Sequence, residues 1–402
     1  GVALDDAPEI TFEPASQEPE FRPFITTWMT TDGRITIPVA ENGYQYSYDI
    51  YWESTVDSTE QGWLQHQTQA VTLDSLQMGT TYRVEIKGTF PRLDFTAFDA
   101  ASPDSLKLLS VKQWGDVRWE SMEYAFARAT NLEIHAADAP DLRKVTSMKG
   151  MFAGAASVNS DFNHWDVSSV TNMESMFESA SAFNGDISSW DVSGVLDMSG
   201  MFFDATSFNG DISSWDVSSV TQMARMFQYA TSFSGDLSSW NVGNVEDMSA
   251  MFASAASFNG DISGWNVSNV RYMPGMFNYA ETFNQDIGDW DVSNVEDMGP
   301  AFDAGGMFEG ASSFDQDLGR WDVRNVKNMR WMLDHSGLSR ENYDALLTGW
   351  SQLALQQSVR LDAAGLEYCA EPARQHLIDM FDWEISGDRL AGDCSDPGTS
   401  PV

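Results

Sequence analysis

A repeat of 25 residues occupies the middle of the chain and limits the folds that the chain can adopt. A Met-Phe pair opens each regular unit, and the methionines are Met151, Met176, Met201, Met226, Met251 and Met276. The tryptophans of the units are Trp165, Trp190, Trp215, Trp240, Trp265, Trp290 and Trp321, where six extra residues, 301–306, lengthen the last step. A unit this short cannot bury its apolar side alone, so such repeats fold by stacking on one another.

The unit 201–225 predicts a short helix, a turn and a short strand. Met201, Phe202 and Ala205 lie at helical spacing, and the segment 209–211 carries a turn signal. The segment 215–218 alternates apolar and polar residues, as a half-buried strand does. Stacked strands would form a parallel ladder with about 4.8 Å between neighbours. We expect the tryptophan and methionine columns to form the shared core, rather than a carbohydrate platform or a soft-metal site.

The consensus MFxxAxxFNxDISxWDVSxVTxM, entered through the segment 113–117, resembles the BspA-like repeat of bacterial surface proteins. That family is related to leucine-rich repeats and occurs in adhesins, lipoproteins and other surface proteins. The resemblance covers roughly residues 100–390. It implies a leucine-rich-repeat-like, right-handed solenoid with a role in attachment or recognition. It supplies no catalytic residues, and its motif fixes no binding positions.

The segments that flank the array predict a further unit on each side. Segments with alternating faces at 24–28, 44–52 and 81–88 predict strands, and together they resemble β-sandwich modules of the polycystic-kidney-disease type. Those modules usually carry a Trp-Gly-Asp-Gly turn, whereas this chain has the sequence WEST at 52–55. Helical segments near the C-terminus resemble the cap that shields the last coil of such an array from water.

The predicted fold class is therefore mainly β with short helices. The predicted organisation is a linker at 1–20, an immunoglobulin- or polycystic-kidney-disease-like β-sandwich at 21–98, a solenoid of 25-residue repeats at 99–335, a small α/β cap at 336–394 and a linker at 395–402.

The charge of the chain is strongly negative, with 60 acidic and 22 basic residues and a formal net charge of −38. Such a surface repels phosphate backbones and anionic lipid, which argues against nucleic-acid and membrane-surface binding. Adaptation to salt and specific cation binding both explain the acidic excess, and calcium is the candidate cofactor. No run reaches the roughly 18 apolar residues of a membrane span, and no signal-peptide core precedes the first acids. We expect a piece of a larger exported protein that is monomeric within that longer chain.

The two cysteines, Cys369 and Cys394, lie close together near the C-terminus. In an exported protein such a pair predicts a local disulfide. The alternative, a metal site, lacks a second pair of ligands nearby.

The sequence predicts no enzyme. The five histidines, His66, His135, His164, His335 and His376, lie in five unrelated settings. None belongs to an HExxH or a nucleophile motif, and no phosphate-binding loop is present. Carboxylates are so abundant that some pairs of them must arise by chance, so a pair alone is not evidence for a glycosidase.

Polar columns accompany the apolar ones. The column directly after each tryptophan is Asp166, Asp191, Asp216, Asn241, Asn266, Asp291 and Asp322. If Trp215 and Val217 point inward, strand alternation turns Asp216 outward, so this column would tile an exposed acidic sheet face. Two further columns contain Asp211 and Asn209, and we interpret these as turn-stabilising residues whose amides bond from coil to coil.

The function predicted from these patterns is a cell-surface adhesion or ligand-binding module, located outside the cell or on its surface. Short Asp, Asn and Ser side chains suit hydroxyl groups, directly or through a bridging cation. The predicted partner is therefore a glycan or polar peptide of a host or neighbouring cell surface. A structural spacer without a ligand of its own, and an accessory module of a glycan-processing enzyme, are the alternatives.

Overall fold

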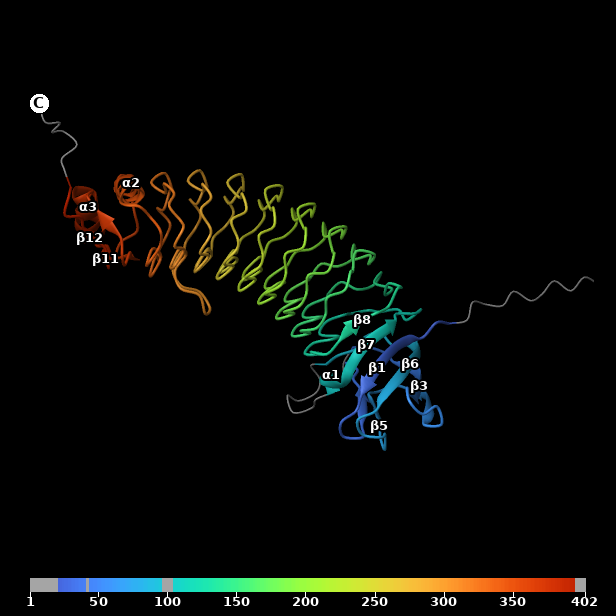
Figure 1. The fold of residues 1–402 in the computed structure, drawn as a ribbon. Coiled ribbons are helices and arrows are strands. Elements are labelled where there is room, and N and C mark those ends of the chain that lie inside the picture. Colours follow the sequence, from blue (N-terminus) through green and yellow to red (C-terminus); the bar gives the residue numbers. More distant parts are fainter. Residues whose placement is uncertain (1–20, 41–42, 96–103, 395–402) are drawn as a thin grey trace, which may run out of the picture.

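The computed structural model describes residues 21–40, 43–95 and 104–394, and its fold is mainly β with a few short helices. Two sheets at the N-terminal end are followed by a curved stack of repeats and then by two helices (Figure 1). We call each repeat unit a coil and residues 114–339 the coil stack. The linkers predicted at 1–20 and 395–402 lie outside the described residues.

The N-terminal part contains a six-stranded sheet and a separate two-stranded sheet. The larger sheet has the order β4-β3-β6-β1-β7-β8, with β1 at Phe24–Met29, β3 at Ser47–Ser54, β4 at Gln61–Gln67, β6 at Thr81–Thr89, β7 at Leu108–Gln113 and β8 at Glu133–Ile134. The smaller sheet pairs β2, Ile35–Ile37, with β5, Val71–Leu73, in antiparallel register. Alternate residues of β6 (Tyr82, Val84 and Ile86) are buried, and they share one core with both strands of the smaller sheet.

Strand β7 joins the N-terminal sheet to the coil stack. It follows the short helix α1, Asp104–Lys107, and pairs antiparallel with β1 on one side. On the other side it pairs in parallel with β8, where Ser110 faces Glu133. The hydrogen-bonded sheet therefore continues from the N-terminal strands into the first coil.

The coils stack through a parallel backbone ladder that runs along the residues around each opening methionine. The N–H groups of Met198, Gly200, Phe202 and Asp204 donate to the carbonyls of Gln222, Ala224, Met226 and Gln228 in the next coil, at 3.0, 2.8, 2.9 and 2.8 Å. The N–H groups between them bond within their own coil, as that of Met201 does to Met198 O at 3.1 Å. Two residues of the segment, Gly200 and Asp204, have φ of 61° and 55°, which turns the chain between ladder positions.

This ladder corrects two sequence predictions. The helix predicted from Met201, Phe202 and Ala205 is wrong, because every second N–H of this segment bonds to the next coil instead of to a carbonyl four residues back. The strand predicted at 215–218 is also wrong, because residues 215–217 have no regular secondary structure and a turn begins at Ser218. The alternation there correctly predicted burial, with Trp215 inside and Asp216 outside, but it did not locate the ladder.

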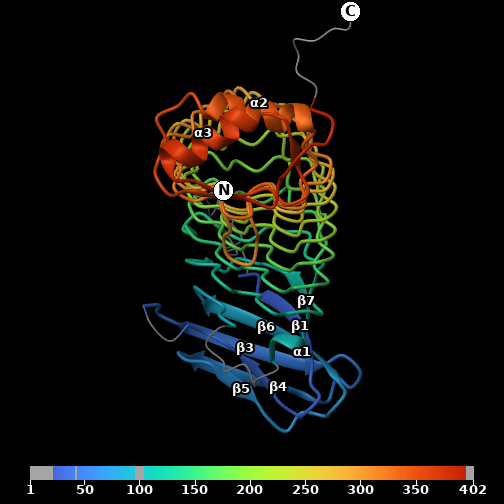
Figure 2. The same cartoon turned by 90° about the vertical axis from the view of Figure 1, so that its left-hand side faces the viewer.

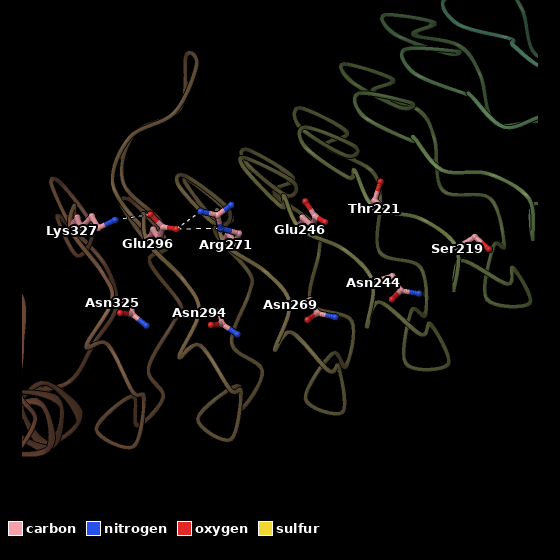
Figure 3. A pocket seen from close by; sticks show the side chains of 10 residues that line it. All are labelled: Ser219, Thr221, Asn244, Glu246, Asn269, Arg271, Asn294, Glu296, Asn325 and Lys327. Carbon is pink, nitrogen blue, oxygen red and sulfur yellow. Dashed lines mark hydrogen bonds and ion pairs between the residues drawn. The ribbon is translucent and has the colours of Figure 1, made fainter.

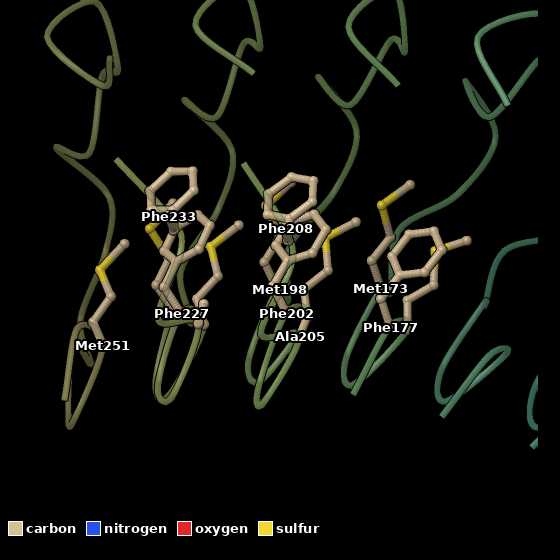
Figure 4. Packing of buried hydrophobic residues seen from close by; sticks show 14 of the residues in the cluster. Met173, Phe177, Met198, Phe202, Ala205, Phe208, Phe227, Phe233 and Met251 are labelled. Carbon is tan, nitrogen blue, oxygen red and sulfur yellow. The ribbon is translucent and has the colours of Figure 1, made fainter. Parts of the chain in front are cut away.

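The interior of the stack consists of side-chain columns that repeat from coil to coil. Neighbouring rings of Phe202 and Phe227 are parallel within 9°, with centroids 5.6 Å apart, and Met198 and Met251 pack in the same interior (Figure 4). Trp215 is 3% exposed, and its indole N–H donates to Ile187 O of the preceding coil at 3.2 Å. The prediction that the tryptophan column forms the core is confirmed.

The C-terminal end covers the last coil with two helices and two pairs of short strands. They are α2 at Arg340–Trp350, β9 at Arg360–Asp362, β10 at Glu367–Tyr368, α3 at Glu371–Phe381, β11 at Glu384–Ser386 and β12 at Arg389–Leu390. Figure 2 shows α2 and α3 lying across the end of the stack. Trp350 donates its indole N–H to Leu318 O at 3.0 Å and so continues the tryptophan column into α2. Cys369 and Cys394 are joined by a disulfide.

Candidate functional site

The seven residues predicted to form a binding face lie in one column, but they do not form a sheet face. Asp216 is exposed, and its Oδ1 accepts the backbone N–H of Ser218, two residues further along the chain, at 3.0 Å. This bond from a side chain to the backbone holds a local turn. The same bond is made by Asp166, Asp191, Asn241, Asn266, Asp291 and Asp322. The predicted sheet face is therefore wrong, because none of these residues lies in a strand, while the ligand-binding role of the column stays a prediction.

The turn bonds also change the acidity of this column. The hydroxyl and N–H of Ser218 lower the pKa of Asp216, and Ser168 does the same to Asp166. At the end of the column, hydrogen bonds from Arg324 lower the pKa of Asp322, which is half-buried. These carboxylates therefore stay charged at a lower pH than a free aspartate.

The other two polar columns serve the fold in the way that the sequence indicated. Asp211 accepts the N–H of Ser213 at 3.0 Å in a turn of its own. In the asparagine column, the side-chain oxygen of Asn184 accepts the backbone N–H of Asn209 in the next coil at 2.8 Å. These side chains hold turns and neighbouring coils together.

A polar groove of about 720 Å³ (Figure 3) runs along the C-terminal half of the stack. Its first residue in each coil follows the predicted column by three residues, as Asn244 follows Asn241. Each of five successive coils contributes two residues to it. One wall is Ser219, Asn244, Asn269, Asn294 and Asn325, and the other is Thr221, Glu246, Arg271, Glu296 and Lys327. This groove was not among the sites predicted from the sequence.

The amide wall of the groove is fixed by bonds between coils. Asn244 donates from Nδ2 to Ser218 O of the preceding coil at 2.7 Å, and Asn294 donates in the same way to Ser268 O at 2.8 Å. An amide has two N–H donors and an acceptor oxygen. This bond uses one donor, so each amide keeps a donor and an acceptor for a ligand while its position is held.

The charged wall alternates in sign from coil to coil. Glu296 accepts hydrogen bonds from Arg271 and from Lys327, the latter at 2.7 Å, and these bonds lower the pKa of Glu296 to about 2. The Arg271 guanidinium also lies 5.5 Å from the ring centroid of Tyr272, which is 40% exposed. The groove thus offers amides and both signs of charge at regular intervals.

The sequence held one signal for this groove, which is the rarity of basic residues within the repeats. Between residues 151 and 319 the chain has 24 acidic residues and two basic ones, Arg225 and Arg271. Each of the two lies beside an exposed or partly exposed aromatic ring. In an array this regular, the positions that break the pattern mark the distinctive surfaces.

Neither a metal centre nor a membrane span emerges from the part of the chain that the structure describes. There, no group of three or more His, Cys, Asp and Glu side chains could hold a metal ion. Over the same residues, the helices are too short or too polar to cross a lipid bilayer.

A mainly β fold with an interior that repeats every 25 residues defines a repeat protein. The family described as "Mycoplasma protein of unknown function, DUF285" matches residues 120–238, 210–306 and 302–352, which together span more than half of the chain. The chain belongs to this family. No curated protein and no solved structure matches it.

Proposed function

We propose that this chain is a non-catalytic adhesion or ligand-binding module of a larger bacterial surface protein, located outside the cell. Its coil stack would be a BspA-like, leucine-rich-repeat-like right-handed solenoid. Its N-terminal sheets would be a β-sandwich of the polycystic-kidney-disease type. The Cys369–Cys394 disulfide supports an oxidising location, because such bonds persist outside the cytosol.

The observation that carries this proposal is the groove built from two polar side chains of each of five coils. Contacts that recur at each coil suit a partner that itself repeats, such as a glycan chain or an extended polar peptide. Asn269, Asn294 and their neighbours offer the donors and acceptors that hydroxyl and amide groups require. Each contact would be weak, and affinity would grow with the number of coils engaged.

A structural spacer is the second candidate, and one observation favours it. The column that begins at Asp166 uses its side-chain oxygens to hold turns, so a regular acidic edge needs no ligand to explain it. The groove separates the two candidates, because a spacer does not require a wall of alternating charges.

The test replaces groove residues by those that the chain itself uses at equivalent positions of earlier coils. Asn269→Ser copies Ser219, while Arg271→Thr and Glu296→Thr copy Thr221. Ser169 and Thr221 both donate to a carbonyl of the preceding coil, at 2.9 and 3.3 Å, so the triple variant should fold. Its net charge equals that of the parent chain.

Binding is measured on glycan and peptide arrays, and the melting temperature checks the fold. We expect the triple variant to lose at least about tenfold in affinity for a ligand of the parent chain, since about 1.4 kcal/mol corresponds to a factor of ten. The control, Asp191→Asn with Asp216→Asn, copies Asn241 and should bind as the parent does. Unchanged binding by a folded triple variant would remove the groove and favour the spacer.

A further inference from the structure

The insertion at 301–306 folds back over the ladder side of the stack. Ala301 and Ala304 form an antiparallel bridge, and the loop lies beneath the preceding coils in Figure 1, where it is orange. Ala304 is buried against Ala250 and Ala253. A Cβ atom added to Gly275 would lie 2.9 Å from the Cβ of Ala304. The coils that the loop covers therefore carry small residues at the contact, which make room for the loop.

Asp303 anchors the loop three coils back along the stack. One carboxylate oxygen accepts from Gln228 Nε2 at 2.9 Å, and the other accepts from the Tyr229 hydroxyl at 3.0 Å. The Arg225 guanidinium lies 3.5 Å from the same carboxylate. The loop is therefore a docked part of the surface.

The anchored loop holds an aromatic ring out in water. Phe302 is 65% exposed, and its φ of 53° is a left-handed conformation that a residue with a side chain adopts at a cost. The Arg225 guanidinium lies 5.0 Å from the centroid of this ring and 4.2 Å from that of Phe203, so it bridges the two rings. Arg225 contacts this ring, yet most of Phe302 remains open to a partner.

A hollow of about 290 Å³ opens beside these rings. Phe203, Phe302 and Arg225 line it together with three carboxylates, Glu174, Glu178 and Asp247. Arg225 is already paired with Asp303, and Glu174 is paired with Lys149 at 2.6 Å. Asp247 and Glu178 have no ion pair among the described residues, so the hollow carries excess negative charge beside two aromatic rings.

We propose that this hollow binds a lysine or arginine side chain from a basic segment of a partner protein. The cation would lie on the ring of Phe302 and face Glu178 and Asp247, while its aliphatic stem would cover Phe203. A hollow of this volume takes one side chain, and a chain with net charge −38 attracts basic segments over a distance. This site uses the ladder side of the stack and is independent of the groove.

The test uses a fluorescein-labelled nonapeptide with three lysines separated by glycine and serine, and measures its affinity by anisotropy at physiological ionic strength. Phe302→Ala changes no charge, and we expect it to weaken binding by about 5- to 30-fold, the range of a cation–π contact that loses water. Phe302→Trp keeps an aromatic ring and should bind at least as well as the parent. Melting temperatures confirm that both variants are folded.

A pair of charge variants separates this site from general attraction. Glu178→Gln and Glu371→Gln each remove one negative charge, but only Glu178 lines the hollow, whereas the exposed Glu371 begins α3 at the far end of the stack. We expect several-fold weaker binding for Glu178→Gln and a change of less than about twofold for Glu371→Gln, because salt screens charges beyond roughly 8 Å. Equal effects of the two variants, parent-like binding by Phe302→Ala, or no saturable binding by the parent chain would each overturn the proposal.

Discussion

Trp215 and Asp216 are neighbours in the sequence, yet they belong to two regions of the stack that repeat for different reasons. Trp215 repeats because each indole fills the interior and bonds to the coil before it. Asp216 repeats because each turn at the exposed edge needs a side-chain acceptor. Repetition at a surface therefore indicates a structural requirement, and the surfaces that break the repeat, the groove and the hollow beside Phe302, are better candidates for binding.

The interior gives the largest expected effect. Trp215→Ala should reduce the free energy of unfolding by about 3–5 kcal/mol, because it leaves a cavity and removes the bond to Ile187 O. Trp63 of β4 is 49% exposed, so Trp63→Ala is the matched control and should cost less than about 1 kcal/mol. Denaturation in urea measures both. Equal costs would contradict the division between interior and surface.

At the exposed edge that contains Asp216, substitutions should lower the free energy of unfolding less, by an amount that depends on the new residue. Asp216→Ala should cost about 0.5–1.5 kcal/mol, the net value of the lost turn bond, while Asp216→Asn should cost only the smaller part that depends on the carboxylate charge. The reason is that Asn241 and Asn266 make the same bond in their own coils. Urea denaturation at neutral pH distinguishes the two variants.

The pH dependence of Asp216 follows from its bonds to Ser218. Because these bonds lower the pKa of Asp216, its contribution is present above the pKa of the unfolded chain and is lost as the pH falls through the lowered value. The Asn variant does not titrate at this position. It should therefore gain stability relative to the parent chain on acidification, and parallel stability curves from about pH 6 to about pH 2 would contradict the assignment.

The sequence predicted the parts of this fold that depend on spacing alone. The 25-residue interval and the burial of Trp215 follow from the pattern of apolar residues, which is local information. The position of the ladder does not follow from this pattern. In segment 197–204 alternate N–H groups bond to the next coil, and in segment 215–218 alternate side chains are buried, but only segment 197–204 forms the ladder. The left-handed conformation of Asp204 and Ser254, neither of which is glycine, has no sequence signal of its own.

The surfaces were harder to predict because they join residues from several coils. The groove becomes visible only when Asn244 and Asn269 are stacked with the residues two positions further along each coil. The contact of Asp303 with Gln228 spans 75 residues and depends on how the insertion folds back. The rarity of Arg225 and Arg271 was the signal that the sequence did offer.

Calcium gives the smallest expected effect and tests the acidic edge as a whole. Salt should raise the melting temperature, because screening reduces the repulsion within a chain of net charge −38. A calcium site takes about 6–8 oxygen ligands, whereas among the described residues no three acidic, cysteine or histidine side chains are grouped to hold an ion. At matched ionic strength, calcium should therefore raise the melting temperature no more than magnesium does. A larger rise with calcium, abolished by Asp191→Asn together with Asp216→Asn, would assign cation binding to this edge and would contradict its purely structural interpretation.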